Sequence, residues 1–381
     1  MQHNIVIIQR QFSHYRKPLF DELNKLYKIT LLHAGTDSSI REEKAIYAKR
    51  VSYIKYWKKT TNVFLFVLSF LFKLKPKIVV HEANPSILSL PLVFFFCKIS
   101  RAKFVLWGHG YNRNSIFNPS RYFKSYVRLL YLRLADAVIF YDYTTMIFFR
   151  KYLDSNKLFV AQNTIDTKKL TSIAKEFDII GKNRIKKEIG FTADFNIIFI
   201  GRLLFEKDPF SALKIFEKVK NKFKGQTINL HFIGDGPARN HLIEYIKKNN
   251  LGSEVKLYGA IYDDIKIGKL LYGSDLVINP GYVGLNVNQS FCFNIPVFTF
   301  SQSASGPFHS PEVEYLKDGE TGFFAEPYDY NELAEKIINY LKSTILQENL
   351  KSNIKFMVEN VITIDNMLKG FTDCFEYLLV K

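Results

Sequence analysis

Short apolar runs and longer segments of helical periodicity alternate along the chain, and the series occurs twice. Runs of strand length in the first half are at 4–9, 28–34, 77–82, 103–110, 136–142 and 157–163. In the second half they are at 195–202, 228–237, 255–260, 275–281, 296–300 and 322–327. Amphipathic segments such as 120–134 and 208–223 lie between them. Nearly continuous apolar strands separated by helices are typical of parallel sheets covered on both faces, so the pattern predicts a doubly wound α/β fold.

The repetition predicts two Rossmann-like domains, at 1–170 and 190–362, joined by a polar helical segment. Such sheets bind ligands at the carboxyl ends of their strands, so we expect the two domains to face each other across a crevice. Residues 363–381 form a helix with enough apolar side chains to pack on a large surface. We expect this helix to return to the N-terminal domain.

Composition narrows the class of protein. The 381 residues are 47% hydrophobic, enough for two cores, and the cysteines at 97, 292 and 374 are too far apart to suggest disulfides or a thiolate metal site. A reducing cytoplasm fits this usage. The longest apolar runs, 63–72 and 88–97, are about half the length that spans a bilayer, and the first residues read as a strand rather than a signal peptide.

The net charge of +17 is concentrated in one half. Residues 1–170 contain 28 lysines and arginines against 10 acids, or +18, whereas the remainder has 25 against 26, or −1. This asymmetry predicts an anionic partner for the N-terminal domain. We see no basic-aromatic module such as an RNA-recognition motif, so nucleic acid is not favoured.

Segment 120–134 combines a cationic side and an apolar side, as a membrane-surface helix does. Arg121, Lys124 and Arg128 recur at helical spacing. Its apolar side consists of Phe123, Val127, Leu130, Tyr131 and Leu134. Further lysines border the apolar run 63–72: Lys55, Lys58, Lys59, Lys73, Lys75 and Lys77. Either this is an ordinary surface helix of a Rossmann domain, or the domain lies on an anionic leaflet; we predict the second.

The first candidate ligand-binding segment is "FIGRLLFEKD" (199–208). A strand ends there at Gly201 and is followed by Arg202 and Lys207. Two cations at a strand end, beside a helix that starts near Pro209, suit a diphosphate. The alternative is an ordinary strand end.

Three further strand ends carry weaker signals. "HFIGDGP" ends in a turn with Gly234 and Gly236, where a ligand could approach the backbone closely. "LYGA" would place main-chain groups of Tyr258 and Gly259 near a nucleobase.

The fourth strand end, "NPGYVGLNVNQSF" (279–291), leads into a short helix. The backbone N–H groups of Gly284, Leu285 and Asn286 would open that helix toward the donor phosphates. The Gln289 side chain, on the first turns, would hydrogen-bond a ribose hydroxyl.

These clusters, in this order and spacing, resemble the family 4 glycosyltransferases of the GT-B fold, which are retaining enzymes that use nucleotide sugars. The resemblance covers nearly the whole chain, and Asn163 and Asp166 in "FVAQNTID" match the family's inter-domain motif. It implies that Arg202 and Lys207 neutralise the leaving diphosphate, so that no metal ion is needed. The absence of an Asp-x-Asp motif and of clustered histidines agrees with this. His109 in "WGHG" would face the donor sugar and the reacting centre; its alternative is a structural role.

The chain departs from the family at its pair of glutamates, which fall at Gly281 and Gln289. The first usually contacts donor-sugar hydroxyls and the second the ribose, so the departure predicts an altered donor site, with a binding-only relic as the alternative. Glu312 or Glu314 could replace the missing acid, or both could be exposed loop acids.

The loop after the first strand, "QRQFSHYRKPLF" (9–20), also departs from the family's glycine-rich turn. It places His14, Tyr15 and Arg16 on the expected acceptor side. Arg16 would then contact a lipid-linked diphosphate, or it is a solvated helix start.

Together these features predict a bacterial glycosyltransferase that moves a sugar from a UDP- or GDP-linked donor to a polyprenyl-diphosphate-linked saccharide. The expected pathway class is envelope polysaccharide, O-antigen or capsule, with retention, without metal or other cofactor, at the cytoplasmic face of the membrane. Two alternatives stay open: a nucleotide-sugar epimerase of the same fold, which needs acid and base carboxylates, and a catalytically silent donor-binding subunit.

Overall fold

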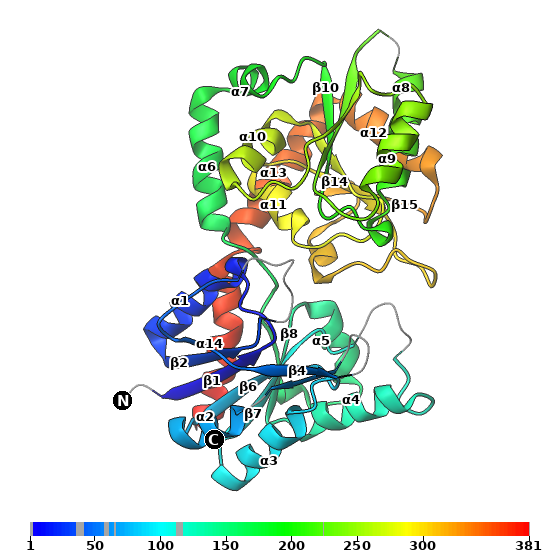
Figure 1. The fold of residues 1–381 in the computed structure, drawn as a ribbon. Helices are drawn as coiled ribbons and strands as arrows, with labels where there is room; N and C mark the ends of the chain where they lie inside the picture. Colours follow the sequence, from blue (N-terminus) through cyan, green and yellow to red (C-terminus); the bar gives the residue numbers. More distant parts are fainter. Residues whose placement is uncertain are drawn as a thin grey trace. The chain divides into compact units, whose positions relative to one another are not determined.

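A computed structural model describes residues 3–35, 42–56, 61–64, 66–111, 117–223 and 225–380, without side-chain detail at 55–56 and 61–64. The chain divides into two compact units (Figure 1). Unit 1 comprises Met1–Asp166 and Ile364–Lys381, and unit 2 comprises Thr167–Thr363. The segment 171–189, predicted as a connection, therefore lies within unit 2.

Unit 1 is built on a seven-stranded parallel sheet with the order β3-β2-β1-β6-β7-β8-β9. Its strands are β1 (Asn4–Gln9), β2 (Lys28–His33), β3 (Ala48–Arg50), β6 (Ile78–Glu82), β7 (Lys103–Gly108), β8 (Ala137–Phe140) and β9 (Leu158–Val160). The six predicted strands are confirmed. The sequence missed β3 and an antiparallel pair, β4 (Tyr53–Tyr56) with β5 (Thr61–Phe64).

Helices cover both faces of this sheet. One face packs against α2 (Val67–Leu74), α3 (Leu90–Ser100), α4 (Phe123–Leu134) and α5 (Tyr143–Arg150), which share one apolar core with the strands. The other face packs against α1 (Lys17–Leu26) and α14 (Ile364–Val380). Short 3-10 helices η1 (His14–Arg16) and η2 (Ser155–Lys157) complete the unit.

The C-terminal helix α14 is part of the unit 1 core. Phe371 packs edge-on against Trp107 of β7, with 4.8 Å between ring centroids. A Cβ at Gly370 would lie 2.1 Å from the Val160 carbonyl oxygen, so only glycine lets the helix approach β9 this closely.

Unit 2 repeats the plan with a six-stranded parallel sheet of order β12-β11-β10-β13-β14-β15. Its strands are β10 (Phe195–Ile200), β11 (Ile228–Ile233), β12 (Val255–Leu257), β13 (Leu276–Ile278), β14 (Val297–Phe300) and β15 (Gly322–Ala325). All six match the predicted runs, so the expectation of two parallel-sheet Rossmann-like units is confirmed.

The helices of unit 2 also form two layers. The core on one face of the sheet includes α8 (Pro209–Lys222), α9 (Arg239–Lys248) and α12 (Tyr330–Lys342). A second group of helices packs together: α6 (Thr167–Ile180), α7 (Lys182–Ile189), α10 (Asp264–Gly273), α11 (Asn286–Cys292) and α13 (Thr344–Asn360). The 3-10 helices are η3 (Phe205–Lys207) and η4 (Pro311–Tyr315).

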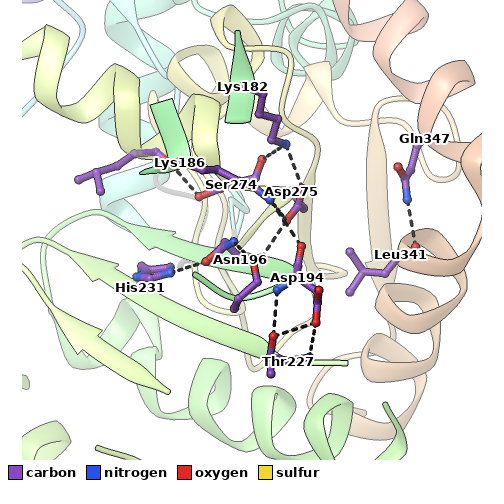
Figure 2. Close-up of polar contacts among 12 residues, drawn as sticks. Lys182, Lys186, Asp194, Asn196, Thr227, His231, Ser274, Asp275, Leu341 and Gln347 are labelled. Atoms are coloured by element: carbon purple, nitrogen blue, oxygen red, sulfur yellow. Dashed lines mark hydrogen bonds and ion pairs between the residues drawn. The ribbon is translucent and has the colours of Figure 1, made fainter. Parts of the chain in front are cut away.

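A polar network fastens the amino ends of the unit 2 strands (Figure 2). The Asp275 carboxylate accepts from Lys182 Nζ at 2.9 Å and from the Asn196 backbone N–H at 2.8 Å. Asn196 Oδ1 in turn lies 3.0 Å from His231 Nε2. This network therefore joins α7, β10, β11 and the start of β13, at the edge of the sheet opposite to the glycine-rich turns.

In the described parts of both units, no helix is long and apolar enough to cross a bilayer.

Candidate functional site

The glycine-rich turns at the carboxyl edge of the unit 2 sheet interlock. A Cβ at Gly234, after β11, would lie 1.9 Å from the Gly201 carbonyl oxygen, and one at Gly236 would lie 2.6 Å from that of Leu203. The Leu203 N–H donates to the Asp235 carbonyl at 2.9 Å. These glycines are therefore required by backbone packing between two turns. Their contact with a ligand stays a prediction.

Lys207, in η3, is the buried cation of this edge, with 7% of its surface exposed. Its Nζ donates to the Tyr282 carbonyl at 3.1 Å and lies 3.9 Å from the centre of the Tyr282 ring. The aliphatic stem passes over Gly201, with Cδ 3.5 Å from the position of a Cβ there. A Cβ at 201 would therefore be in ordinary contact with the lysine stem, and glycine is favoured here by its φ of 146°.

The Lys207 ammonium is held in an environment that disfavours its charge. Burial, together with repulsion from Arg202, lowers the pKa of Lys207 to about 8, and the charges of Glu312 and Glu206 oppose this fall. Arg202 itself is exposed. Two cations that repel each other, one of them desolvated, form a site that an anion would stabilise.

The start of α8 is closed by a side chain. Asp208, at a φ of 49°, caps the helix, and its carboxylate accepts from the Ser211 N–H at 3.1 Å. The sequence predicted that this terminus, near Pro209, would help to hold the diphosphate. The Asp208 carboxylate occupies this terminus, so the helix is not needed for the predicted site, and contact of Arg202 and Lys207 with a diphosphate stays a prediction.

Gly281 packs directly on the backbone of Lys207. Its N–H donates to the Lys207 carbonyl at 3.2 Å, and a Cβ at 281 would lie 2.2 Å from the Lys207 carbonyl carbon. Any side chain at this position would push away the segment that carries Lys207. The missing family glutamate therefore has no room in this chain.

A carboxylate reaches the same region from η4. Glu312 is 1% exposed, and its Oε2 lies 3.9 Å from the position of a Cβ on Gly284. Its charge acts on both Lys207 and Tyr282. The reading of Glu312 and Glu314 as exposed loop acids is wrong, because Glu312 is buried and Glu314 is half-buried.

His309 joins η4 to the loop before α11. Its Nδ1 accepts from the Val283 N–H at 3.1 Å, and its Nε2 lies 2.8 Å from the Phe300 carbonyl. The Ser310 N–H donates to the Val283 carbonyl at 3.0 Å. This clamp places Glu312 beside the loop that ends in Gly284.

The loop before α11 uses one of its predicted donors internally. The Gly284 N–H donates to Asn286 Oδ1 at 2.8 Å, so it is engaged within the loop here, and its contact with a phosphate stays a prediction. Leu285 is the N-cap of the helix, and the Gln289 N–H donates to the Leu285 carbonyl at 3.0 Å. The donor roles of Leu285, Asn286 and the half-buried Gln289 stay predictions.

The turn after β12 is also partly engaged within the unit. The Tyr258 N–H donates to the Phe232 carbonyl and the Gly259 carbonyl accepts from the Gly234 N–H, at 2.9 and 2.8 Å. The Tyr258 hydroxyl lies 3.3 Å from His231 Nδ1. A nucleobase at this turn would therefore contact its other main-chain groups.

In unit 1, His109 follows β7 and is exposed at the carboxyl edge of the sheet. Its ring lies 4.6 Å from that of Tyr141, centroid to centroid. A Cβ at Gly110 would lie 2.5 Å from the Phe149 ring, which explains the second glycine of "WGHG". The tight turn leaves the imidazole at the surface, consistent with a role toward a ligand.

Arg16 is enclosed within unit 1 and is not a solvated helix start. It is 8% exposed, and its guanidinium lies 5.1 to 5.4 Å from the ring centres of Tyr15, Trp107 and Tyr141. It donates to Asn163 Oδ1 and lies 3.3 Å from Met367 Sδ of α14. Arg16 thus links η1 to the segment after β9, through Asn163, and to α14, through Met367. The neighbouring His14 is exposed and Tyr15 half-buried.

A charged pair at the same edge was missed from the sequence. Arg10 follows β1, Glu82 ends the adjacent β6, and Arg10 Nε donates to Glu82 Oε1 at 2.7 Å. Their charges act on Tyr141, as does that of Arg16. The sequence signal that could have revealed this pair is a charged residue at the end of each of two apolar runs.

Among the described residues, no three His, Cys, Asp or Glu side chains are grouped to hold a metal ion.

Solved structures have the same architecture over the whole chain. The Anabaena protein HepE in complex with UDP superposes with a TM-score of 0.73 at 15% identity, covering 99% of this chain and 100% of that one. The fold is GT-B. The lipopolysaccharide outer core galactosyltransferase WaaB in its apo form has the same GT-B fold, with a TM-score of 0.64, 13% identity and coverage of 98% and 99%.

Part of the chain also matches a known protein family in sequence. Residues 181–357, within unit 2, match the family model described as glycosyl transferases group 1. The match lies within unit 2 and covers most of it. Over 345 residues the chain is 26% identical to an uncharacterized glycosyltransferase of Methanocaldococcus jannaschii, MJ1059, a match that covers 81% of this chain and 79% of that protein.

Proposed function

We propose that this protein transfers a sugar from a nucleotide-sugar donor to a lipid-linked saccharide, with Lys207 and Arg202 binding the donor diphosphate. The observation that carries the proposal is the buried Lys207 ammonium, repelled by Arg202 at the carboxyl edge of the unit 2 sheet. HepE, which shares the fold, was solved with UDP and with UDP-glucose, and this favours UDP among the possible nucleotides.

The two cations would do the work of a metal ion. During transfer, the bond between the anomeric carbon and the diphosphate oxygen breaks, and negative charge accumulates on the leaving group. The acceptor hydroxyl oxygen forms the new bond to that carbon and passes its proton to the departing diphosphate oxygen. A desolvated ammonium stabilises the developing charge more strongly than a solvated one does, because water screens it less. Metal independence and retention of configuration, as in the family 4 enzymes, are parts of this proposal.

Glu312 would supply the carboxylate that contacts the donor sugar. Position 281 has no room for an acid, whereas the Glu312 carboxylate is buried beside the loop that ends in Gly284. A buried carboxylate is acceptor-only when ionised, which suits sugar hydroxyl groups. The carboxylate would thus come from η4 instead of the strand end.

Unit 1 would bind the acceptor. His109 is exposed at the carboxyl edge of its sheet, where we propose that it faces the donor sugar and the reacting centre. His14 and Tyr15 are candidate acceptor contacts. Arg16 is not proposed to contact a diphosphate, because its guanidinium is held by three rings and Asn163.

The acceptor class is proposed from a protein of the same fold and from the charge of unit 1. WaaB, which shares the fold, is by its name a lipopolysaccharide galactosyltransferase. We propose a polyprenyl-diphosphate-linked saccharide of an envelope polysaccharide, O-antigen or capsule, used at the cytoplasmic face of the membrane. The basic N-terminal half agrees with an anionic acceptor.

The buried Glu312 carboxylate also favours a second candidate, a nucleotide-sugar epimerase. Such an enzyme needs acid and base groups beside the donor, and it changes the sugar without an acceptor. A donor-binding subunit without catalysis is the third candidate. The three differ in what they do to a bound donor.

One assay distinguishes them. The protein is incubated with UDP-, GDP- and CDP-sugars, with and without lipid-linked saccharides extracted from membranes. Release of nucleoside diphosphate is followed by mass spectrometry, and the identity of the sugar by NMR, because epimers have equal masses. We expect one donor to release its nucleoside diphosphate only when acceptor is present. An altered sugar without acceptor would show an epimerase, and binding without any turnover would show a silent subunit. Binding of no donor would overturn the proposal.

A further inference from the structure

The outer side of α2, α3 and α4 exposes large apolar side chains. All three helices pack their inner residues into one core against the same face of the unit 1 sheet. Their outer sides therefore look away from that face together (Figure 1). We call these outer side chains the apolar face; its members are Phe72, Leu92, Phe95, Ile99, Phe123, Tyr126, Leu130 and Leu134.

The exposure of these side chains is large. Phe72 is 64% exposed, Phe95 60%, Ile99 84% and Phe123 80%. Single exposed apolar residues are ordinary on protein surfaces, but large apolar side chains on the outer sides of three helices that cover one face of a sheet indicate an interaction site. A partner that removes this face from water would gain the corresponding hydrophobic free energy.

Helix α4 shows that the exposure is not a by-product of core packing. Leu129 and Leu132 face the core. Phe123, Tyr126, Leu130 and Leu134 form a second stripe, at helical spacing, on the outer side. An ordinary surface helix of a Rossmann domain would carry polar residues there. Most of the apolar stripe predicted from the sequence is thus the outer one, and the surface-helix alternative does not account for it.

The same helices and the loops beside them are strongly basic. Residues 66–135 contain 11 lysines and arginines and a single acid, Glu82. Cations exposed on these segments are Lys73, Lys75, Lys77, Lys98, Arg101, Arg121, Lys124 and Arg133. Lys58 and Lys59, which the sequence added to the basic surface, lie outside the described residues, as does the side chain of Lys55. An apolar face among cations is complementary to anionic head groups above acyl chains.

We propose that the apolar face docks the protein on a leaflet of anionic lipid, with the outer stripes of α2, α3 and α4 inserted between the head groups. Each fully buried Phe, Leu or Ile side chain contributes about 1.5–3 kcal/mol. Each cation near an anionic surface adds about 1 kcal/mol. A few of each suffice for stable but reversible attachment. The inference rests on exposure and charge in unit 1 and does not depend on the proposed transfer activity.

The test is flotation of the full-length protein with vesicles. One set contains phosphatidylcholine alone, and the other has about a third of its lipid as phosphatidylglycerol, which supplies the anionic surface. We expect binding to the anionic set and little to the neutral set. The variant F95S/F123S should bind at least about tenfold more weakly, the loss of a little over 1.4 kcal/mol. K73Q/K124Q should lose binding to the anionic set as well.

The matched control is I179S/F356S in unit 2, where both side chains are exposed and lie outside the apolar face, at 88% and 60%. It should bind like the wild-type protein. Unchanged binding of F95S/F123S would overturn the proposal, as would absence of wild-type binding to anionic vesicles. A wild-type dimer in gel filtration that F95S/F123S abolishes would also overturn it, because a second copy would then cover the face. Thermal melts of all variants check that they fold.

Discussion

The backbone of Lys207 lies against Gly281, whose N–H donates to the Lys207 carbonyl at 3.2 Å. A Cβ at 281 would lie 2.2 Å from the carbonyl carbon of Lys207. The close contact between these two backbone segments therefore excludes an acid at position 281 and also helps to hold the buried lysine in place. An acid for the donor site must come from another element, and Glu312 of η4 is buried beside the adjoining loop.

Replacing Gly281 should disturb the lysine. The Gly281→Ala change forces the 207 segment to move, and overpacking of this kind costs about 1–3 kcal/mol. We expect a lower melting temperature and at least about tenfold weaker binding of UDP by calorimetry, the equivalent of about 1.4 kcal/mol. Gly252→Ala is the control, since nothing lies within 4 Å of a Cβ there. Wild-type affinity in Gly281→Ala would show that the contact is not needed.

Donor binding should weaken above pH 8. Burial and the Arg202 charge lower the pKa of Lys207 to about 8, so in the free protein the side chain is charged below that pH and neutral above it. A diphosphate binds the charged form, so the Kd for UDP should be level below pH 8 and rise by up to about tenfold per pH unit above it. Lys207→Arg keeps its charge and should give a flat profile. A flat wild-type profile would contradict the pKa assignment.

Glu312 should act on the sugar more than on the nucleotide. Glu312→Gln removes the charge while keeping the shape, so we expect weaker binding of the nucleotide sugar at nearly unchanged affinity for UDP. Because the Glu312 charge raises the pKa of Lys207, the upper limb of the pH profile should also move to lower pH. Glu314→Gln, on the same 3-10 helix, is the control. Equal losses for UDP and its sugars would indicate a structural role only.

Stability should fall in mild acid because of His231. Burial, and secondarily the charge of Lys256, lowers the pKa of this histidine to about 4. Between about pH 6.5 and 4 the unfolded chain binds the proton and the folded chain does not, so stability is present above that range and is lost as the pH falls through it. The full loss is about 3 kcal/mol. His231→Gln should flatten the dependence of the unfolding free energy on pH in urea melts. An unchanged slope would exclude His231 as its source.

The sequence predicted the strands well because buried parallel strands are continuous apolar runs, and all twelve predicted runs form strands. It missed β3, whose residues Ala48–Arg50 are mostly exposed at the sheet edge. Arg202 and Lys207 were found because cations directly after a buried strand are conspicuous. The cap at the start of α8 was missed, although Asp208 before Pro209 is a capping signal.

Other features depend on contacts that no local pattern contains. Gly234 is required by the carbonyl of Gly201, 33 positions earlier, and Glu312 is buried because His309 clamps its segment to Val283. Arg16 is enclosed by residues from three distant segments: Trp107 of β7, Tyr141 after β8 and Asn163 after β9. Helix α4 is apolar on two sides, so its periodicity could not indicate which side faces the core.

The central claim is tested most directly by calorimetry of UDP binding in the presence of EDTA. Lys207→Met is compared with the wild-type protein and with Lys222→Met, an exposed lysine in the last turn of α8. We predict metal-independent binding by the wild type and by Lys222→Met, and at least about a hundredfold loss in Lys207→Met, or about 2.7 kcal/mol. Equal binding by all three proteins, or binding that EDTA abolishes, would contradict the assignment of the diphosphate to Lys207.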